Sequence, residues 1–228
     1  IEPYGADTMR LAILFIAPPE KDFDWDPKAV AGANRFIKRA WNIVWQLSDG
    51  AVSGDVDPKS LKGLGAELFR TLHGLGVKAT SDFDRGQFNT AISAAMEIVN
   101  AASKYLNETP AAERNHELDF RVAHDVVAML APICPHWAEE LFHEALHLTG
   151  SVYNEPWPAF DAELAKSDEV EIAVQIKGKV RGRITVAADA SDDEMAEAAK
   201  AAVADQLEGK TVKKVIVVKG RLVNIVAI

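Results

Sequence analysis

The segment Glu171–Val186, EIAVQIKGKVRGRITV, marks a change in the periodicity of the chain. Ile172, Val174 and Ile176 alternate with polar or small residues, which is the period of a strand with one buried face. Over residues 8–148 the apolar residues recur instead at helical spacing. The sequence therefore predicts an α+β protein, in which a mostly α-helical bundle is followed by a small domain that contains a sheet.

The turn inside this segment is constrained by the alternation of side chains. If Ile176 and Val180 face the same core, they pair across a three-residue loop, residues 177–179. A two-residue loop would break this match. We therefore expect a hairpin with Val180 on its apolar face and Arg181 on the face turned away from the core.

The remainder of this domain predicts a helix and two further strands. Ser191 and Glu194 have the spacing of a capping box, in which the two side chains satisfy free backbone amides at the start of a helix. Strands at residues 212–218 and 222–226 follow. Residues 170–228 are thus predicted to form a ββαββ domain, whose helix covers one face of a mainly antiparallel sheet.

The helical part of the chain predicts an antiparallel bundle, because its apolar stripes are wide enough to cover one another. Asp7 is a candidate cap for a first helix over residues 8–17. In the helix predicted at residues 27–47, the buried stripe includes Trp41 and Trp45. The other predicted helices cover residues 60–76, 83–106 and 111–131, and a last one begins at Pro135.

The chain is expected to have four parts. They are a connecting segment with the first helix at residues 1–26, the helical bundle at 27–148, a linker that packs on the bundle at 149–169, and the C-terminal domain at 170–228. The linker is rich in turn formers and places Trp157 between two prolines.

The composition is that of a folded globular protein, with 48% apolar and 26% charged residues. No apolar run approaches the roughly 20 residues that span a bilayer, and no signal-peptide pattern begins the chain, so we expect a cytoplasmic protein without membrane contact. Cys134 is the only cysteine, which excludes an intramolecular disulfide and a cysteine-based zinc site. Because the first residue is Ile1, we expect a fragment of a longer chain.

The net charge of -9 is unevenly distributed. From Val170 onward ten Lys or Arg and eight Asp or Glu give +2, so the preceding residues carry -11. Cations on strands and turns can contact successive phosphates of an RNA without reading its bases. The alternative is a solvated sheet face whose lysines protect edge strands from aggregation. The candidate RNA contacts in this domain are Lys177, Lys179, Arg181, Arg183, Lys213, Lys214, Lys219 and Arg221.

The helix predicted at residues 27–47 carries a second group of cations. Arg35, Lys38 and Arg39 lie on the face opposite its apolar residues. They form either an ordinary solvated face or a second contact to the same polyanion.

Signals for catalysis or metal binding are weak. His136, Glu140, His143 and His147 have a spacing that could present ligands on one helical face. Surface or capping histidines on an acidic helix are more common, and no separate carboxylate or cysteine motif supports a metal. No nucleophile motif, phosphate loop or dinucleotide fingerprint occurs, so we expect no catalytic residue and no metal ligand in this chain.

Four stretches resemble leucyl-tRNA synthetases of the bacterial type. YGADTMRLAILFIAPPEKDFDW (residues 4–25) and RFIKRAWNIVW (35–45) resemble the segment that follows the Lys-Met-Ser-Lys-Ser catalytic loop of that family. VQIKGKVRGRITVAADAS (174–191) and GKTVKKVIVVKGRLVNIV (209–226) resemble its extreme C-terminal domain. The resemblance spans essentially the whole chain.

Two further stretches resemble a wider group of proteins. FNTAISAAMEIVN (88–100) and LAPICPHWAEEL (130–141) are similar to the anticodon-binding helical bundle that class I aminoacyl-tRNA synthetases share. The bundle motifs alone leave valyl-, isoleucyl- and methionyl-type enzymes open. The C-terminal strands favour the leucyl type.

The resemblance implies a fragment of a leucine-tRNA ligase, an enzyme of translation. Neither the His-Ile-Gly-His signature nor the Lys-Met-Ser-Lys-Ser loop occurs in this sequence. The fragment is therefore expected to be inactive alone and to hold no cofactor, whereas the parent enzyme binds ATP and Mg. The implied partners are tRNA-Leu, contacted on its anticodon stem side and outer corner, and the missing catalytic and editing domains of the same chain, as a monomer.

A function of another class is also open. The chain would then be a helical protein-interaction module with a solvated α+β domain and no RNA contact. Binding that weakens steeply with ionic strength is expected of the RNA-binding alternative, because bound cations release counterions from phosphates.

Overall fold

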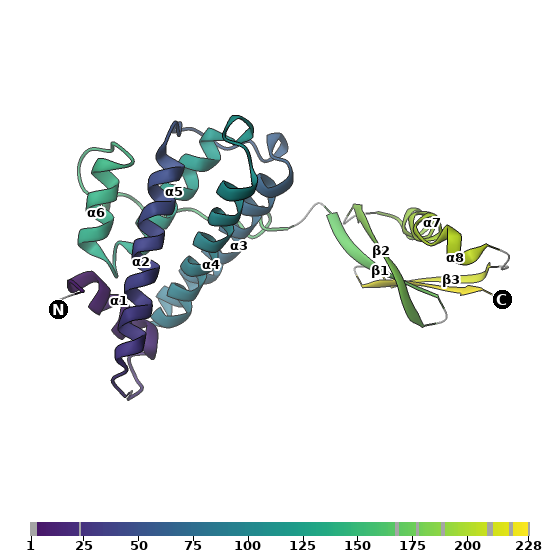
Figure 1. Ribbon diagram of the computed structural model, residues 1–228, viewed down its shortest axis with the longest axis horizontal. Helices are drawn as coiled ribbons and strands as arrows, with labels where there is room; N and C mark the ends of the chain where they lie inside the picture. The colour runs from purple at the N-terminus through teal and green to yellow at the C-terminus, as the bar shows by residue number, and fades with distance from the viewer. Residues whose placement is uncertain are drawn as a thin grey trace. The chain divides into compact units, whose positions relative to one another are not determined.

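The computed structural model describes residues 4–22, 24–166, 169–176, 178–187, 190–208, 212–218 and 221–227. The chain divides into two compact units, residues 1–166 and residues 167–228. The first unit is helical, and the second combines a sheet with helices (Figure 1). The prediction of an α+β protein is confirmed.

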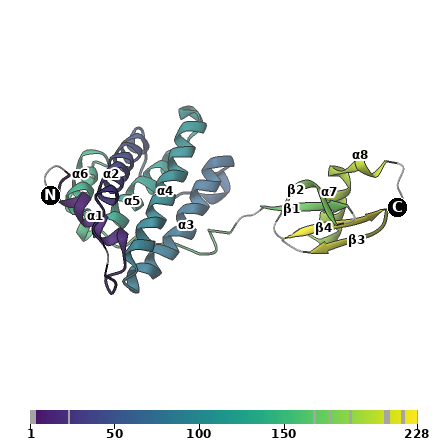
Figure 2. The ribbon, with the colours of Figure 1, turned by 60° about the horizontal axis from the view of Figure 1, so that its bottom comes forward.

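The first unit is built from helices packed along one another. Helix α3 runs beside α4, and α2 packs against α1 and α5 (Figures 1 and 2). Leu72, Ile98 and Leu118 are among the side chains that this packing buries completely. The elements are α1 (Ala6–Ile16), α2 (Pro27–Ser48), the 3-10 turn η1 (Pro58–Ser60), α3 (Gly63–Asp84), α4 (Phe88–Glu108), η2 (Ala111–Glu113), α5 (His116–Leu130), α6 (Pro135–Glu144) and η3 (Val152–Asn154).

Asp7 lies inside α1 and caps a different helix from the one predicted. Because α1 begins at Ala6, Asp7 is too late in the chain to be its cap. Its carboxylate accepts a hydrogen bond from the backbone N–H of Trp137 (2.6 Å) and lies 2.9 Å from Nδ1 of His136. Asp7 therefore satisfies a free amide in the first turn of α6, which explains why this carboxylate is buried.

Gly76 does not end the third helix, as the prediction of a helix at residues 60–76 assumed. Helix α3 continues to Asp84, and α4 starts at Phe88, five residues later than predicted. A Cβ atom at position 76 would lie 2.2 Å from the ring of Phe160. The glycine is thus explained by close packing against a distant side chain rather than by a helix end.

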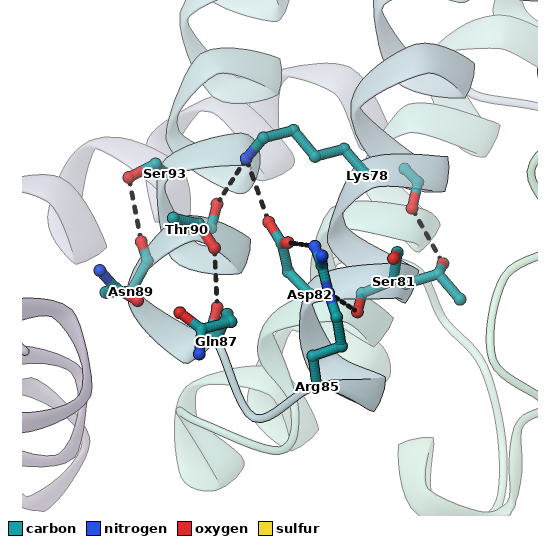
Figure 3. Close-up of polar contacts among 10 residues, drawn as sticks. Lys78, Ser81, Asp82, Arg85, Gln87, Asn89, Thr90 and Ser93 are labelled. Atoms are coloured by element: carbon teal, nitrogen blue, oxygen red, sulfur yellow. Dashed lines mark hydrogen bonds and ion pairs between the residues drawn. The ribbon is translucent and has the colours of Figure 1, made fainter. Parts of the chain in front are cut away.

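The turn between α3 and α4 is closed by a buried carboxylate (Figure 3). Asp82, whose side chain is 5% exposed, lies 3.1 Å from Nζ of Lys78 and 2.6 Å from Nη2 of Arg85. Burial alone would raise the pKa of Asp82, but hydrogen bonds from Thr90, Lys78 and Arg85 outweigh it and hold the pKa below its usual value. This pairing joins the end of α3 to the start of α4.

Residues 157–165, here called the strap, lie on the helices of the first unit. Trp157 donates from Nε1 to Oγ1 of Thr80 (2.8 Å), and the backbone N–H of Asp161 donates to Nδ1 of His73 (3.0 Å). Arg121 donates to the carbonyl of Ala159 (2.6 Å). The strap is therefore held to α3 and to α5 by several hydrogen bonds. Among the described helices, none is both long enough and apolar enough to cross a membrane.

The second unit is a four-stranded mixed sheet with helices on one face. Its strand order is β2-β1-β4-β3, in which β1 and β4 are parallel and the outer pairs are antiparallel. Helix α7 packs over the buried side chains of the sheet, with the predicted capping box of Ser191 and Glu194 at its start. The elements are β1 (Glu169–Ile176), β2 (Lys179–Ala187), α7 (Asp192–Ala202), α8 (Ala204–Leu207), β3 (Val212–Val218) and β4 (Leu222–Ala227).

The hairpin between β1 and β2 differs from the prediction. Ile176 pairs with Lys179, so the loop has two residues instead of three. A bulge then leaves Arg181 without a paired residue, because Val174 is opposite Gly182 while Gln175 is opposite Val180. The extra residue reverses the alternation, and Val180 is 57% exposed instead of buried.

Candidate nucleic-acid interface

The cations of the second unit lie on the outer strands of its sheet. Strands β2 and β3 form the two edges, and the central strands β1 and β4 contain no Lys or Arg. This arrangement places the Lys and Arg residues of the strands at the two edges of the sheet and none on its central strands. The edge cations are Lys179, Arg181 and Arg183 on β2 and Lys213 and Lys214 on β3, while Arg221 directly precedes β4.

One of the predicted contact residues of this unit is already paired, and two belong to segments that are not described. Lys177 and Lys219 lie outside the described residues. Arg183 forms an ion pair with Glu171 across the β1–β2 pair, with both side chains exposed. An exposed ion pair contributes little to stability and is easily exchanged, but it reduces the net positive charge at this position. No local pattern in the sequence indicates Glu171 as a partner of Arg183.

Two polar residues that the sequence analysis missed hold the backbone near the hairpin tip. The backbone N–H of Gly178, which has φ 78°, donates to Oδ1 of Asn224 (3.2 Å). The carbonyl of Arg181 accepts a hydrogen bond from Nε2 of Gln206 (3.2 Å). Helix α8 and strand β4 therefore fix the backbone on which Lys179 and Arg181 are carried. No local pattern links these residues, since their partners are distant in the sequence.

The three cations predicted on the first unit are exposed on α2. Arg35, Lys38 and Arg39 belong to a helix that contains four Lys or Arg and no Asp or Glu. Within the part of the chain that the structure describes, none of the three has an acidic side chain at ion-pairing distance. This concentration of unpaired positive charge contrasts with the net charge of -9 of the whole chain.

Trp45 is not a core residue, so its predicted burial is wrong, and Trp41 is only partly buried. Trp45 is 47% exposed, whereas Trp41 packs against the edge of the core. Their rings are stacked, with centroids 6.1 Å apart and planes that differ by 11°. Phe36 and Ile43 are buried instead. The face of α2 that packs on the core is therefore rotated toward these two residues, relative to the prediction.

A small surface pocket lies beside Trp41. It has a volume of about 270 Å³ and is lined by Ile37, Lys38, Trp41, Asn42 and Trp137. Trp137 donates from Nε1 to the carbonyl of Ile37 (3.2 Å), so its ring lines the pocket while its donor is already used. Lys38 and Asn42 supply the polar side chains of the pocket.

The histidines of the predicted metal alternative have other partners. His136 lies beside Asp7, and Nδ1 of His143 lies 3.0 Å from the carbonyl of Leu148. Helix α6 ends at Glu144, so His147 does not continue the helical spacing. Over the described ranges, no group of three or more possible metal ligands comes together.

Cys134 is buried and is unsuited to be a nucleophile. Burial raises the pKa of its thiol to about 12, and the nearby carboxylate of Asp7 adds to this effect. The thiol is therefore protonated at neutral pH.

Comparisons with known proteins identify the family of this chain. It is 45% identical over 230 residues to the leucine–tRNA ligase of Fervidobacterium nodosum and 41% identical over 230 residues to that of Thermotoga maritima. Each alignment covers 99% of this chain and 28% of the relative, so the chain spans less than a third of the length of these relatives.

A solved structure has the same fold. In the ternary complex of an Agrobacterium radiobacter K84 LeuRS with tRNA and LeuAMS, the similar region has a TM-score of 0.72 and 23% identity, and it covers 98% of this chain and 28% of that one. Residues 66–197 match the family model described as the anticodon-binding domain of tRNA ligase. The chain therefore belongs to the family of anticodon-binding domains of tRNA ligases, and it resembles the corresponding part of the bacterial leucine–tRNA ligases.

Proposed function

We propose that this chain is the tRNA-binding part of a leucine–tRNA ligase and acts as part of a monomer. It positions tRNA-Leu for ATP-dependent leucylation by catalytic and editing domains that belong to the remainder of the enzyme. The bundle contacts the anticodon stem side of the tRNA, and the second unit contacts its outer corner. ATP and Mg bind to those other domains, because neither signature motif for leucine activation occurs here.

The observation that carries this proposal is the exposure of unpaired cations on α2. Arg35, Lys38 and Arg39 extend into solvent without acidic partners in the described chain, in a protein of net charge -9. A polyanion is the partner that such a surface attracts. The basic edge strands of the second unit offer a further set of phosphate contacts.

The chemical role of such contacts is to position the substrate. Phosphate contacts fix the register and orientation of an RNA and carry no chemistry. They raise the rate of aminoacyl transfer by holding the 3′ end of the tRNA near the reacting groups. The chain is therefore expected to affect the use of tRNA and to leave the activation of leucine unchanged.

The test is a triple variant in the full-length ligase that contains this chain. Replacing Lys179, Arg181 and Arg183 with Ala is expected to raise the KM for tRNA-Leu and to leave leucine-dependent adenylate formation at its original rate. A matched variant, Lys59, Lys104 and Lys200 to Ala, removes the same charge from other surfaces and is expected to change neither. Unchanged tRNA kinetics in the first variant would contradict the assignment of these side chains.

The placement of the cations on edge strands also fits the alternative of a solvated domain that protects its edges. Titration of labelled tRNA-Leu with this chain at several ionic strengths separates the two. RNA binding predicts an affinity that falls with roughly one power of salt concentration for each phosphate neutralised. Absence of any affinity at low ionic strength would favour a protein-interaction module.

A further inference from the structure

Helix α2 presents two tryptophans and two polar side chains on one stripe of its surface. Lys38, Trp41, Asn42 and Trp45 follow the spacing i, i+3, i+4 and i+7, which places them on one face. Trp45 is about half exposed, and Lys38 and Asn42 are exposed. These four residues are here called the tryptophan stripe.

The geometry of the rings favours a flat partner. Trp41 and Trp45 lie nearly parallel, and Trp41 is anchored against the core. A ring that is supported from one side and open on the other can stack on a further planar group with little loss of conformational freedom. Nucleic-acid bases stack on such side chains irrespective of their sequence, because each base has a π face.

The charge around the rings favours a partner with phosphates. Lys38 belongs to the tryptophan stripe, Arg35 precedes it by three residues on the same side of α2, and the helix contains no acidic residue. The surface therefore combines an aromatic face with positive charge. This combination is typical of sites for single-stranded or unstacked nucleotides.

The pocket that Trp41 lines adds polar groups next to this ring. With a volume of about 270 Å³, it lies just below the roughly 300 to 1,000 Å³ of pockets for drug-sized ligands, so it suits one planar ring. The side-chain amide of Asn42 can both donate and accept hydrogen bonds, and Lys38 can donate. Bases carry both donors and acceptors on their edges.

We propose that the tryptophan stripe is a stacking site for one unpaired base of a bound RNA. Trp45 provides the exposed ring, Trp41 stacks against it, and Lys38 and Asn42 contact the edge of the base or its phosphate. This inference rests on the proposed function, because it assumes that the partner of the bundle is an RNA.

The experiment compares two probes of equal charge, an oligouridine and an abasic ribose-phosphate oligomer of the same length. Each is titrated into the chain at low ionic strength while tryptophan fluorescence is recorded. The unsubstituted chain is expected to bind the oligouridine about tenfold more tightly than the abasic oligomer, since stacking on an aromatic side chain contributes a factor of this order.

Three variants test the role of Trp45. Trp45→Ala is expected to remove the preference for bases, and Trp45→Phe to retain part of it, because a smaller ring remains. Trp25→Ala is the matched control. Trp25 is also exposed, but it precedes α2, and the residues from Pro27 to Trp45 span about 27 Å of helix. Far-UV circular dichroism checks that each variant remains folded.

The outcomes separate this inference from the function on which it rests. Equal affinity for the two oligomers, or no binding of either, would overturn the stacking site. The stacking site would also be overturned if Trp45→Ala keeps the preference for bases. It would likewise be overturned if an acidic peptide, which has no bases, quenches the fluorescence of Trp45 as strongly as the oligouridine does. Salt-dependent binding of tRNA-Leu that is unaffected by Trp45→Ala would leave the proposed function intact and overturn only the stacking site.

Discussion

Gly76 and Phe160 fit together because position 76 has no side chain. A Cβ atom there would overlap the aromatic ring, at 2.2 Å. We predict that Gly76→Ala lowers the free energy of unfolding by about 1–3 kcal/mol, since the ring and the strap must move aside. Urea denaturation measures this change.

Gly74→Ala is the matched control for this substitution. It lies in the same helix, and its added Cβ would meet Ala165 at 3.4 Å, an ordinary contact distance. It is expected to be neutral or stabilising, because alanine favours a helix over glycine by up to about 1 kcal/mol. Equal stability of the two variants would show that Phe160 does not occupy the space over Gly76.

Asp7 has a comparable role for α6. We predict that Asp7→Ala destabilises the bundle by about 0.5–2 kcal/mol, because the backbone N–H of Trp137 loses its acceptor in a buried position. Thermal unfolding measures the effect, with the exposed Asp24→Ala as a control. A melting temperature equal to that of the control would argue against the cap.

The strap is the element whose attachment depends on protonation. Nδ1 of His73 accepts a hydrogen bond from the backbone N–H of Asp161, so this nitrogen carries no proton when the strap is bound. Its pKa is lowered chiefly by burial and also by the nearby Arg121, while Asp125 and Asp161 act in the opposite direction. Protonation would therefore remove the hydrogen bond and place a charge beside Phe69 and Phe160.

The sign of the pH dependence follows from this lowered pKa. As the pH falls below about 6.5, the unfolded chain binds a proton at His73 that the folded chain resists, so the stability of the fold decreases. We predict that the free energy of unfolding falls from about pH 6.5 toward the lowered pKa, and that His73→Gln reduces this slope. His147→Gln, at an exposed position, is the control and should leave the slope unchanged.

At the scale of the whole molecule, each of the two units carries its own basic surface. If both units bind one tRNA, each raises the effective concentration of the other at its site. We predict that Arg35→Ala with Lys38→Ala, and separately Lys179→Ala with Arg181→Ala, each weaken the binding of tRNA-Leu and reduce the salt slope by about one for each phosphate that is no longer neutralised.

The control for these double variants is Lys104→Ala with Lys200→Ala, whose lysines form ion pairs elsewhere. Binding is followed by fluorescence anisotropy of labelled tRNA at several salt concentrations. If a double variant keeps the original salt slope, the unit that carries its two substitutions does not bind phosphates.

Local patterns in the sequence were sufficient to predict the types of secondary-structure element and most of the core residues. The helical stripes, the alternation of Ile172, Val174 and Ile176, and the capping box at Ser191 each depend on neighbours within a few residues. The candidate cations were also visible in the sequence, because charge is a property of the residue itself.

Tertiary structure alone decided which of these side chains are open to a partner and which are already engaged. The exposure of Trp45, the ion pair of Arg183 with Glu171 and the cap that Asp7 provides for α6 all depend on the packing of separate elements. The bulge at Arg181 likewise moved Val180 to the exposed face. The sequence by itself determined the family and the order of elements, because these follow from local periodicity and motifs. The folded chain determined the surface available to the proposed RNA partner, because burial and pairing are set by contacts between distant residues.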